Sequence, residues 1–456
     1  MINKTTNFRN ILLFLFVIQS FMVRSQDFLT GEIQSSPNQY LSIYRMKGEV
    51  RYLLDSVVTD NKGVFAYELP KSLQPGMLLL HNNDSKSLKL IYNHEPVQFK
   101  IEGFEKLETL VFINSKENTI WREYIDLRND INLRLNLITP VLDNYPENTK
   151  YYKASKKEYN KLKNKLLGFV ENINKQYANT FSSKLIRTDF VSPPPIELNQ
   201  IDRLDYLKDH FLDSINFADT LLLNSDILTK KMIDFLALHQ QENAGMSELQ
   251  IEFIKALDQI MLRAAEEENV YIFVLGFFLE GFTEMGLSIV TDYLSELPHF
   301  QAECMGVASM MRIEQLVEPF RKIQFGAVAP PIIGNDLTDK PFSLDQIESK
   351  HTIIVFWSIH CPFCLELLPK LKILKRQHPE IEIVSVIIGK QNEDVKDFIE
   401  QEKLDWIHIW DGLNWDSPNA TEYKVYGTPT IFLLNEKHQI IAKPMTYPDL
   451  EKSLNN

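Results

Sequence analysis

The sequence predicts a multidomain chain with a small N-terminal β-sandwich, an all-α middle region and a C-terminal α/β domain. Three observations predict this division. Short apolar runs separated by turn residues occupy 27–113, apolar residues at three- and four-residue steps recur over 114–322, and candidate strands alternate with candidate helices over 323–456. The 456 residues, 44% of them hydrophobic, are enough to form two or three cores.

Residues 1–25 have the order of parts that is typical of a secretory signal peptide. Lys4 and Arg9 come before an apolar stretch at 11–18, and Ser25 closes the segment in which cleavage would occur. The apolar stretch is too short to span a bilayer. No cysteine stands near residue 26 to carry a lipid. We therefore expect a periplasmic or otherwise exported protein that is not a lipoprotein.

The region 27–113 reads as a series of short strands. Turn residues stand between them, at Asn61–Gly63 and at Pro75–Gly76. The candidate strands lie at 40–44, 55–59, 64–69, 77–80, 88–92 and 97–101. Strands of this length and spacing favour a small β-sandwich.

The middle region, 114–322, has the periodicity of helices. Apolar residues recur at helical spacing between Ile120 and Ile131 and again between Leu162 and Ile173. The three prolines at 193–195 interrupt the pattern. The apolar run Tyr271–Phe282 contains Glu280, so we expect a buried helix there and not a membrane span.

Composition excludes several classes of function. The net charge of −13 argues against nucleic acid, or an anionic membrane surface, as a partner. Three cysteines are too few for a scaffold held by disulfides. No glycine-rich phosphate loop and no Ser-His-Asp signature is present, so we expect no cofactor. We also expect no metal, because His360 and two cysteines fall short of a closed zinc site.

The most informative motif is Cys361-Pro362-Phe363-Cys364, which follows the apolar run 352–357 directly. Two thiols at this spacing, where a strand leads into a helix, can form and reopen a disulfide. The N-terminus of the helix favours the thiolate of Cys361. Further along, Thr428 and Pro429 precede a second apolar run, which is the expected place for a cis-proline beside the dithiol. The pattern predicts a redox-active disulfide, Cys361–Cys364.

These motifs also carry a family resemblance. Residues 323–456 resemble the TlpA/ResA-like branch of the thioredoxin superfamily, through Gly326–Pro330, Phe342–Leu344, Val355–Trp357, the two cysteines, Pro369 and Tyr426–Thr430. The resemblance implies a thioredoxin fold for this region. It also implies that Cys361 is the attacking thiol and Cys364 the resolving thiol. Pro429 would then lie against the disulfide, and the backbone of Thr428 would bind the substrate chain.

The sequence departs from the family at three positions. His360 stands where many relatives have tryptophan; if protonated, it would favour the Cys361 thiolate, and otherwise it is an exposed loop residue. Thioredoxins keep a buried acid at the position of Val355, and many ResA-like relatives have glutamate at the position of Leu367. The group that accepts the proton of Cys364 is therefore not identified by the resemblance.

We expect an exported thiol-disulfide oxidoreductase, with reductase favoured over disulfide isomerase, that acts on protein disulfides and receives electrons from a membrane protein. An alternative from another class is a protein- or polymer-binding module whose thioredoxin domain is a redox sensor or is vestigial. The missing acids at Val355 and Leu367 favour that alternative. The sequence does not decide whether the chain forms a homodimer through its N-terminal regions.

Overall fold

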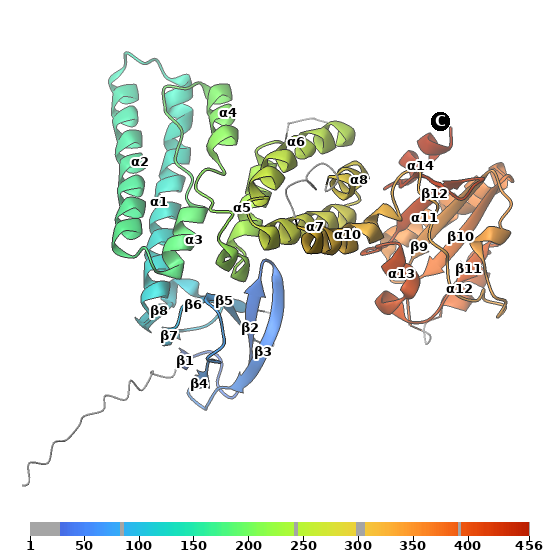
Figure 1. Ribbon diagram of the computed structural model, residues 1–456, viewed down its shortest axis with the longest axis horizontal. Helices are drawn as coiled ribbons and strands as arrows, with labels where there is room; N and C mark the ends of the chain where they lie inside the picture. Colours follow the sequence, from blue (N-terminus) through green and yellow to red (C-terminus); the bar gives the residue numbers. More distant parts are fainter. Residues whose placement is uncertain (1–27, 83–85, 241–244, 298–305, 391–393, 456) are drawn as a thin grey trace, which may run out of the picture. The chain divides into compact units, whose positions relative to one another are not determined.

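The computed structural model describes residues 28–82, 86–240, 245–297, 306–390 and 394–455 (Figure 1). The chain forms two compact units. One contains residues up to 130 together with 171–186, and the other contains 131–170 and 187–456. The signal peptide predicted at 1–25 lies outside the described residues, as does Cys304, the third cysteine of the chain.

The first unit contains two four-stranded sheets. One sheet has the order β4 (Val64–Glu68), β1 (Phe28–Ile33), β7 (Val97–Ile101) and β8 (Val111–Asn114). The other has the order β3 (Val50–Val58), β2 (Tyr40–Lys47), β5 (Gly76–Asn82) and β6 (Ser87–Tyr92). The prediction of N-terminal strands is confirmed, although β1 and β8 were not predicted.

Both sheets contribute to one hydrophobic cluster. Leu29 and Phe99 come from the first sheet, and Ile43 and Leu80 come from the second. Gly31 in β1 explains why the sequence pattern did not predict this strand. Glycine has a low strand propensity, but a Cβ atom here would lie 2.5 Å from the Phe65 ring, so the packing requires glycine.

The first unit also contains parts of three helices: α1 (Lys116–Asn144), α2 (Lys150–Gln176) and α3 (Phe181–Asp189). Glu117, which is buried, joins two of them. Its carboxylate accepts hydrogen bonds from the backbone N–H groups of Phe181 (3.0 Å) and Ser182 (2.6 Å) at the start of α3. Those groups have no partner within their own helix, and a carboxylate also suits the positive end of the helix dipole.

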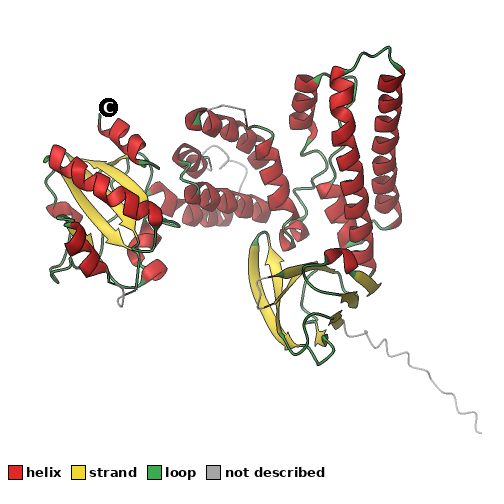
Figure 2. Ribbon diagram, turned by 180° about the vertical axis from the view of Figure 1, so that it is seen from behind, coloured by secondary structure: helices red, strands yellow, loops and turns green. Residues whose placement is uncertain are grey.

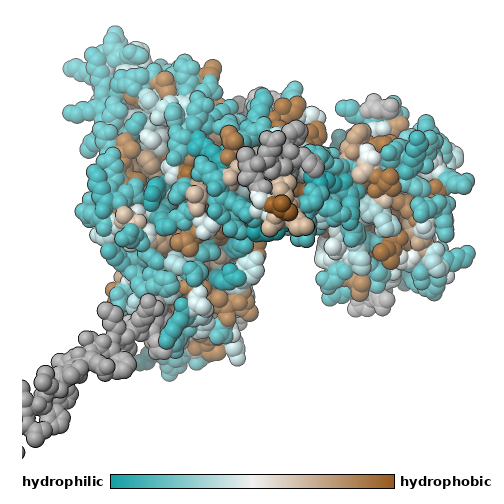
Figure 3. All heavy atoms as spheres, viewed as in Figure 1, coloured by the Kyte–Doolittle hydropathy of each residue, from teal (hydrophilic) through white to brown (hydrophobic). Residues whose placement is uncertain are grey.

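The predicted helical region continues in the second unit. Its helices are α4 (Gln200–His210), α5 (Ile227–Ala237), α6 (Met246–Ala264), α7 (Glu268–Glu284), α8 (Ser288–Glu296) and α10 (Val307–Arg321) (Figure 2). The helix α7 is buried, as predicted, with Val274 and Leu275 in the largest cluster of the unit. Among the described residues, no helix combines the length and the apolar content that crossing a bilayer requires. Hydrophilic side chains cover much of the visible face of α1 and α2 (Figure 3).

The C-terminal region is the predicted α/β domain, with a five-stranded mixed sheet. The strand order is β11 (Ile407–Ile409), β10 (Ile381–Ile387), β9 (His351–Trp357), β12 (Thr430–Asn435) and β13 (Ile440–Ala442). The helices are α11 (Pro362–Gln377), α12 (Val395–Glu402), α13 (Pro418–Glu422) and α14 (Tyr447–Leu454).

Both faces of this sheet are covered by hydrophobic clusters, as the side chains of the central strand β9 show. Val355 and Trp357 point into one hydrophobic cluster, whereas Ile354 and Phe356 point into another. Because successive side chains of a strand alternate between faces, a strand buried on both sides is a continuous apolar run. That is the pattern of residues 352–357.

Candidate active site

The sheet register brings the two predicted halves of the site together. Strand β12 is antiparallel to β9, with Thr430 opposite Phe356. The residues that follow β9 and the residues that precede β12 therefore meet at the same end of the sheet. These are the segment with Cys361 and Cys364 and the segment with Thr428 and Pro429.

Cys361 occupies the N-cap position of α11. Its sulfur accepts a hydrogen bond from the backbone N–H of Cys364 at 3.2 Å. Pro362 takes the first helical position, where its missing N–H would have had no partner in the helix. Cys361 is partly exposed and Cys364 is completely buried; both are free thiols. The local sequence therefore places an accessible sulfur at the positive end of a helix.

The Thr428 carbonyl contacts the exposed thiol. The Cys361 Sγ–H donates to the Thr428 oxygen at 3.1 Å, and the peptide bond between Thr428 and Pro429 is cis. The structure thus brings together four of the predicted site residues: both cysteines, Thr428 and Pro429. The fifth, His360, is exposed on the loop before Cys361, and its backbone N–H lies 3.4 Å from the Ser358 hydroxyl oxygen.

The surroundings of Cys364 keep it protonated. Burial, reinforced by a hydrogen bond with Cys361, raises the pKa of the Cys364 thiol to about 12. The positions where relatives carry acids are apolar here: Val355 and Leu367 belong to the same hydrophobic cluster as Cys364. Without a charged or polar neighbour at those positions, the thiolate of Cys364 is poorly solvated.

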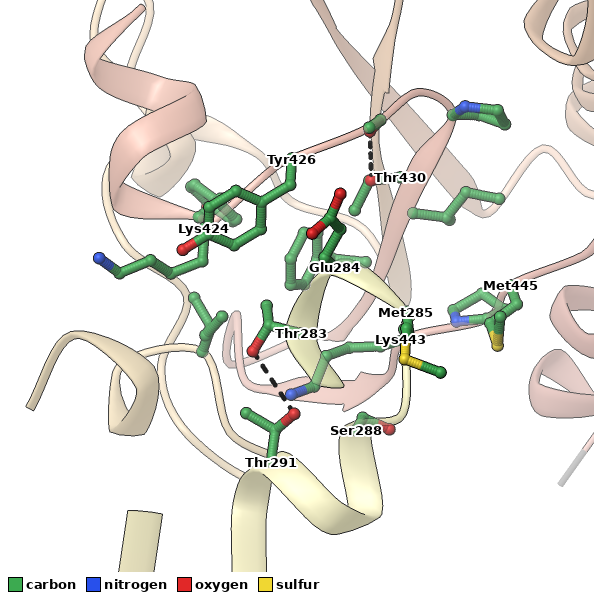
Figure 4. A pocket seen from close by; sticks show the side chains of 18 of the residues that line it. Thr283, Glu284, Met285, Ser288, Thr291, Lys424, Tyr426, Thr430, Lys443 and Met445 are labelled. Carbon is green, nitrogen blue, oxygen red and sulfur yellow. Dashed lines mark hydrogen bonds between the residues drawn. The ribbon is translucent and has the colours of Figure 1, made fainter. Parts of the chain in front are cut away.

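Thr428 and Pro429 also line a pocket of about 280 Å³, which Figure 4 shows from close by. Its walls come from Thr283–Gly286 at the end of α7, from Tyr426–Phe432, and from Lys443–Met445 after β13. No motif in the sequence predicts a role for the end of α7. A glycine after the apolar run, Gly286, indicates where the helix stops, but no local signal places that turn beside Pro429.

Comparison with known proteins gives consistent matches for this part of the chain. The family described as thioredoxin-like matches residues 349–440. Sporulation thiol-disulfide oxidoreductase A of Bacillus subtilis is 32% identical over 113 residues, which are 23% of this chain and 67% of the relative. Thioredoxin-like protein YneN, also of Bacillus subtilis, is 26% identical over 141 residues, covering 29% of this chain and 79% of the relative.

A solved structure is also similar in this region. It is the thioredoxin domain of a thiol-disulfide oxidoreductase from Bacteroides vulgatus, with 27% sequence identity. The similarity covers 29% of this chain and 95% of that domain, with a TM-score of 0.27.

Proposed function

Because this chain belongs to the TlpA/ResA-like branch of the thioredoxin family and is a thiol-disulfide oxidoreductase, we propose that it reduces disulfide bonds in other proteins through Cys361 and Cys364. The observation that carries the proposal is the partly exposed cysteine at the start of α11. Cys361 is within 3.1 Å of the Thr428 oxygen and next to the buried Cys364.

The reaction has two steps. The Cys361 thiolate attacks one sulfur of the substrate disulfide; an S–S bond to the substrate forms, the substrate disulfide breaks, and the leaving sulfur takes up a proton. Cys364 then loses its proton and attacks Cys361. The mixed disulfide breaks, and the second substrate sulfur leaves and is protonated. Two electrons pass to the substrate, and the protein is left with the disulfide Cys361–Cys364.

Thr428 and Pro429 are the proposed contacts for the substrate chain. Their position beside the reactive sulfur supports this role. We propose that His360 adjusts the stability of the Cys361 thiolate, because a positive charge on the exposed imidazole would stand next to that residue in the chain.

The wider arrangement is also part of the proposal. A signal peptide at 1–25 would export the protein, a β-sandwich would occupy 27–113, a helical region 114–322 and the thioredoxin-like domain 323–456. The single core shared by the two N-terminal sheets supports the sandwich. A reductase outside the cytosol would receive its electrons from a membrane protein. If the protein is instead an isomerase, we expect it to form a homodimer through the N-terminal regions.

A pair of variants tests the proposed roles. Cys364→Ser should accumulate a mixed disulfide with substrate proteins, because Cys361 can still attack and nothing resolves the adduct. Cys361→Ser should form no such adduct under the same conditions. Non-reducing electrophoresis and mass spectrometry would identify the adducts. Equal trapping by both variants would contradict the assignment of Cys361 as the attacking thiol.

The reduction potential tests the direction of the reaction. Equilibration in glutathione or dithiothreitol buffers should give a value near that of thioredoxin, about −270 mV, for a reductase. A value of about −120 to −180 mV would instead indicate an oxidase or an isomerase. If the two thiols form no reversible disulfide, the alternative of a binding module is favoured. The apolar residues at Val355 and Leu367 are the observation that keeps this alternative open.

A further inference from the structure

The pocket beside Pro429 has one wall that the thioredoxin-like domain does not provide. That wall is the turn between α7 and α8, residues Thr283–Ser288, from the helical region of the same compact unit. Thr428 lines the pocket and also accepts the hydrogen bond of the Cys361 thiol. The pocket and the reactive sulfur therefore have Thr428 as a common neighbour, so a chain segment bound in the pocket would lie close to the place where a substrate disulfide reacts.

The turn has a fixed geometry. The Leu287 N–H donates to the Phe282 carbonyl (2.9 Å) and the Gly286 N–H to the Thr283 carbonyl (3.0 Å). Gly286 has a φ of +71°. These two bonds and a left-handed glycine form a Schellman motif, which ends α7 and leaves Met285 at its C-cap. On the other side, a Cβ on Gly286 would lie 3.2 Å from atoms of the Met445 side chain, so the two walls touch here.

A buried ion pair holds the two walls together. The Lys443 Nζ lies 3.1 Å from Asp292 Oδ1, with both side chains largely buried, and the second oxygen of Asp292 accepts from the Phe325 N–H at 3.2 Å. Burial lowers the pKa of Lys443 and Asp292 opposes that shift. Since Asp292 neutralises Lys443, this lysine offers no free charge to a ligand.

Three exposed side chains around the pocket are largely apolar. Met285 is 56% exposed, Met445 48% and Tyr426 41%. Methionine side chains adjust to irregular apolar partners. A volume of about 280 Å³ is near the lower end for ligand pockets, about 300–1,000 Å³, and gives room for a few side chains.

The charge at the rim is negative on the side of α7. Glu280 and Glu284 are exposed, one helical turn apart, and lie close enough to Tyr426 to help raise its pKa to about 12, although burial is the larger cause. The Glu284 carboxylate points toward the side of Thr430, whereas the Lys424 ammonium points away from it (Figure 4). Lys424 lies instead over the Phe320 ring, 5.1 Å from its centre.

We propose, on the basis of the proposed function, that the α7–α8 turn makes this pocket a specificity site for a substrate segment in which an apolar residue stands next to a basic one near the cysteine. The apolar side chain enters between Met285 and Met445. The basic side chain lies against Glu284. The helical region thereby selects which polypeptide the dithiol reduces.

The test measures the second-order rate constant for oxidation of the reduced full chain by four disulfides. One is glutathione disulfide. The others are short peptides with one disulfide, flanked by Leu-Lys, Ser-Lys or Leu-Glu. We expect the Leu-Lys peptide to react about tenfold faster than the Ser-Lys peptide, because a pocket that accepts one apolar side chain typically changes the rate constant by about this factor. We also expect a further preference of about threefold over the Leu-Glu peptide, which should fall in 0.5 M salt.

Two variants and a control assign these preferences to residues. Met285→Gln should reduce the Leu-over-Ser ratio to about twofold, and Glu284→Gln should remove the Lys-over-Glu ratio. Met311→Gln changes an exposed methionine of α10 that does not line the pocket, so both ratios should stay as in the parent protein. All rates are compared with the rate for glutathione disulfide in the same protein.

The outcomes separate this inference from the proposed function. If Met285→Gln leaves the Leu-over-Ser ratio unchanged and Glu284→Gln leaves the Lys-over-Glu ratio unchanged, the proposed role of the turn is wrong. Glutathione disulfide reduced at an ordinary rate, with no preference among the peptides, would overturn the inference and support the proposed function. A preference for the Leu-Glu peptide would assign the pocket to an acidic partner and also overturn it. Failure to reduce any of the four disulfides would overturn both.

Discussion

The strongest quantitative prediction concerns the ionisation of Cys364. With a pKa of about 12, about one Cys364 thiol in 10,000 is ionised at pH 8, because the thiolate fraction falls tenfold per pH unit below the pKa. An ordinary cysteine, with a pKa of about 8.5, is about one quarter ionised at that pH. Since the thiolate is the nucleophile, ionisation alone should slow the alkylation of Cys364 by more than three orders of magnitude.

Alkylation with iodoacetamide measures this directly. In reduced protein at pH 8, Cys361 should be labelled before Cys364 reacts, with the two sites distinguished by fragmentation of the peptide that contains both. In 6 M guanidinium, both should react at ordinary rates. The rate at Cys364 should rise about tenfold per pH unit from pH 8 to 11, since the thiolate population grows as the pH approaches the pKa.

The Cys361→Ala variant separates the two causes of the shift. It removes the sulfur that accepts the hydrogen bond of the Cys364 thiol and leaves the burial, which is the larger cause. Cys364 should therefore stay slow in the variant. The reasoning fails if Cys364 of the folded parent protein reacts at pH 8 within tenfold of the rate in guanidinium. It also fails if the variant alone restores that rate, because the hydrogen bond would then be the main cause.

Other predictions concern stability and are read from thermal unfolding of the full chain. Asp292→Ala should destabilise the second unit by about 3 kcal/mol because it leaves Lys443 buried without a counter-ion, and adding Lys443→Met should recover part of the loss. A double variant no more stable than Asp292→Ala would contradict this. Gly63→Ala should cost more than about 2 kcal/mol in the first unit, since its Cβ would lie 2.0 Å from the Ile33 oxygen at a φ of +77°; an unchanged transition would refute it. Glu117→Gln should lower stability by about 2 kcal/mol through weaker bonds to the start of α3, with thiol chemistry unaffected.

The C-terminal fold could be predicted because its signals are local. A strand buried on both faces reads as a continuous apolar run, and residues 352–357 form such a run. A proline at the first helical position, Pro362, indicates that the helix begins at the dithiol. The strand β1 was missed because the packing of two phenylalanine rings requires Gly31, which by itself argues against a strand.

The sequence by itself determined the chemistry that this protein carries. Two thiols three residues apart at the start of a helix define a dithiol whose first sulfur is exposed, because the geometry of one helical turn fixes both positions. The tertiary structure alone decided what surrounds that dithiol. The register of β12 against β9 brings Thr428 to Cys361, and packing of α11 against the sheet removes Cys364 from water. The turn at Met285 reaches the pocket only because helices distant in the chain pack against the α/β domain, and such contacts leave no local trace in the sequence.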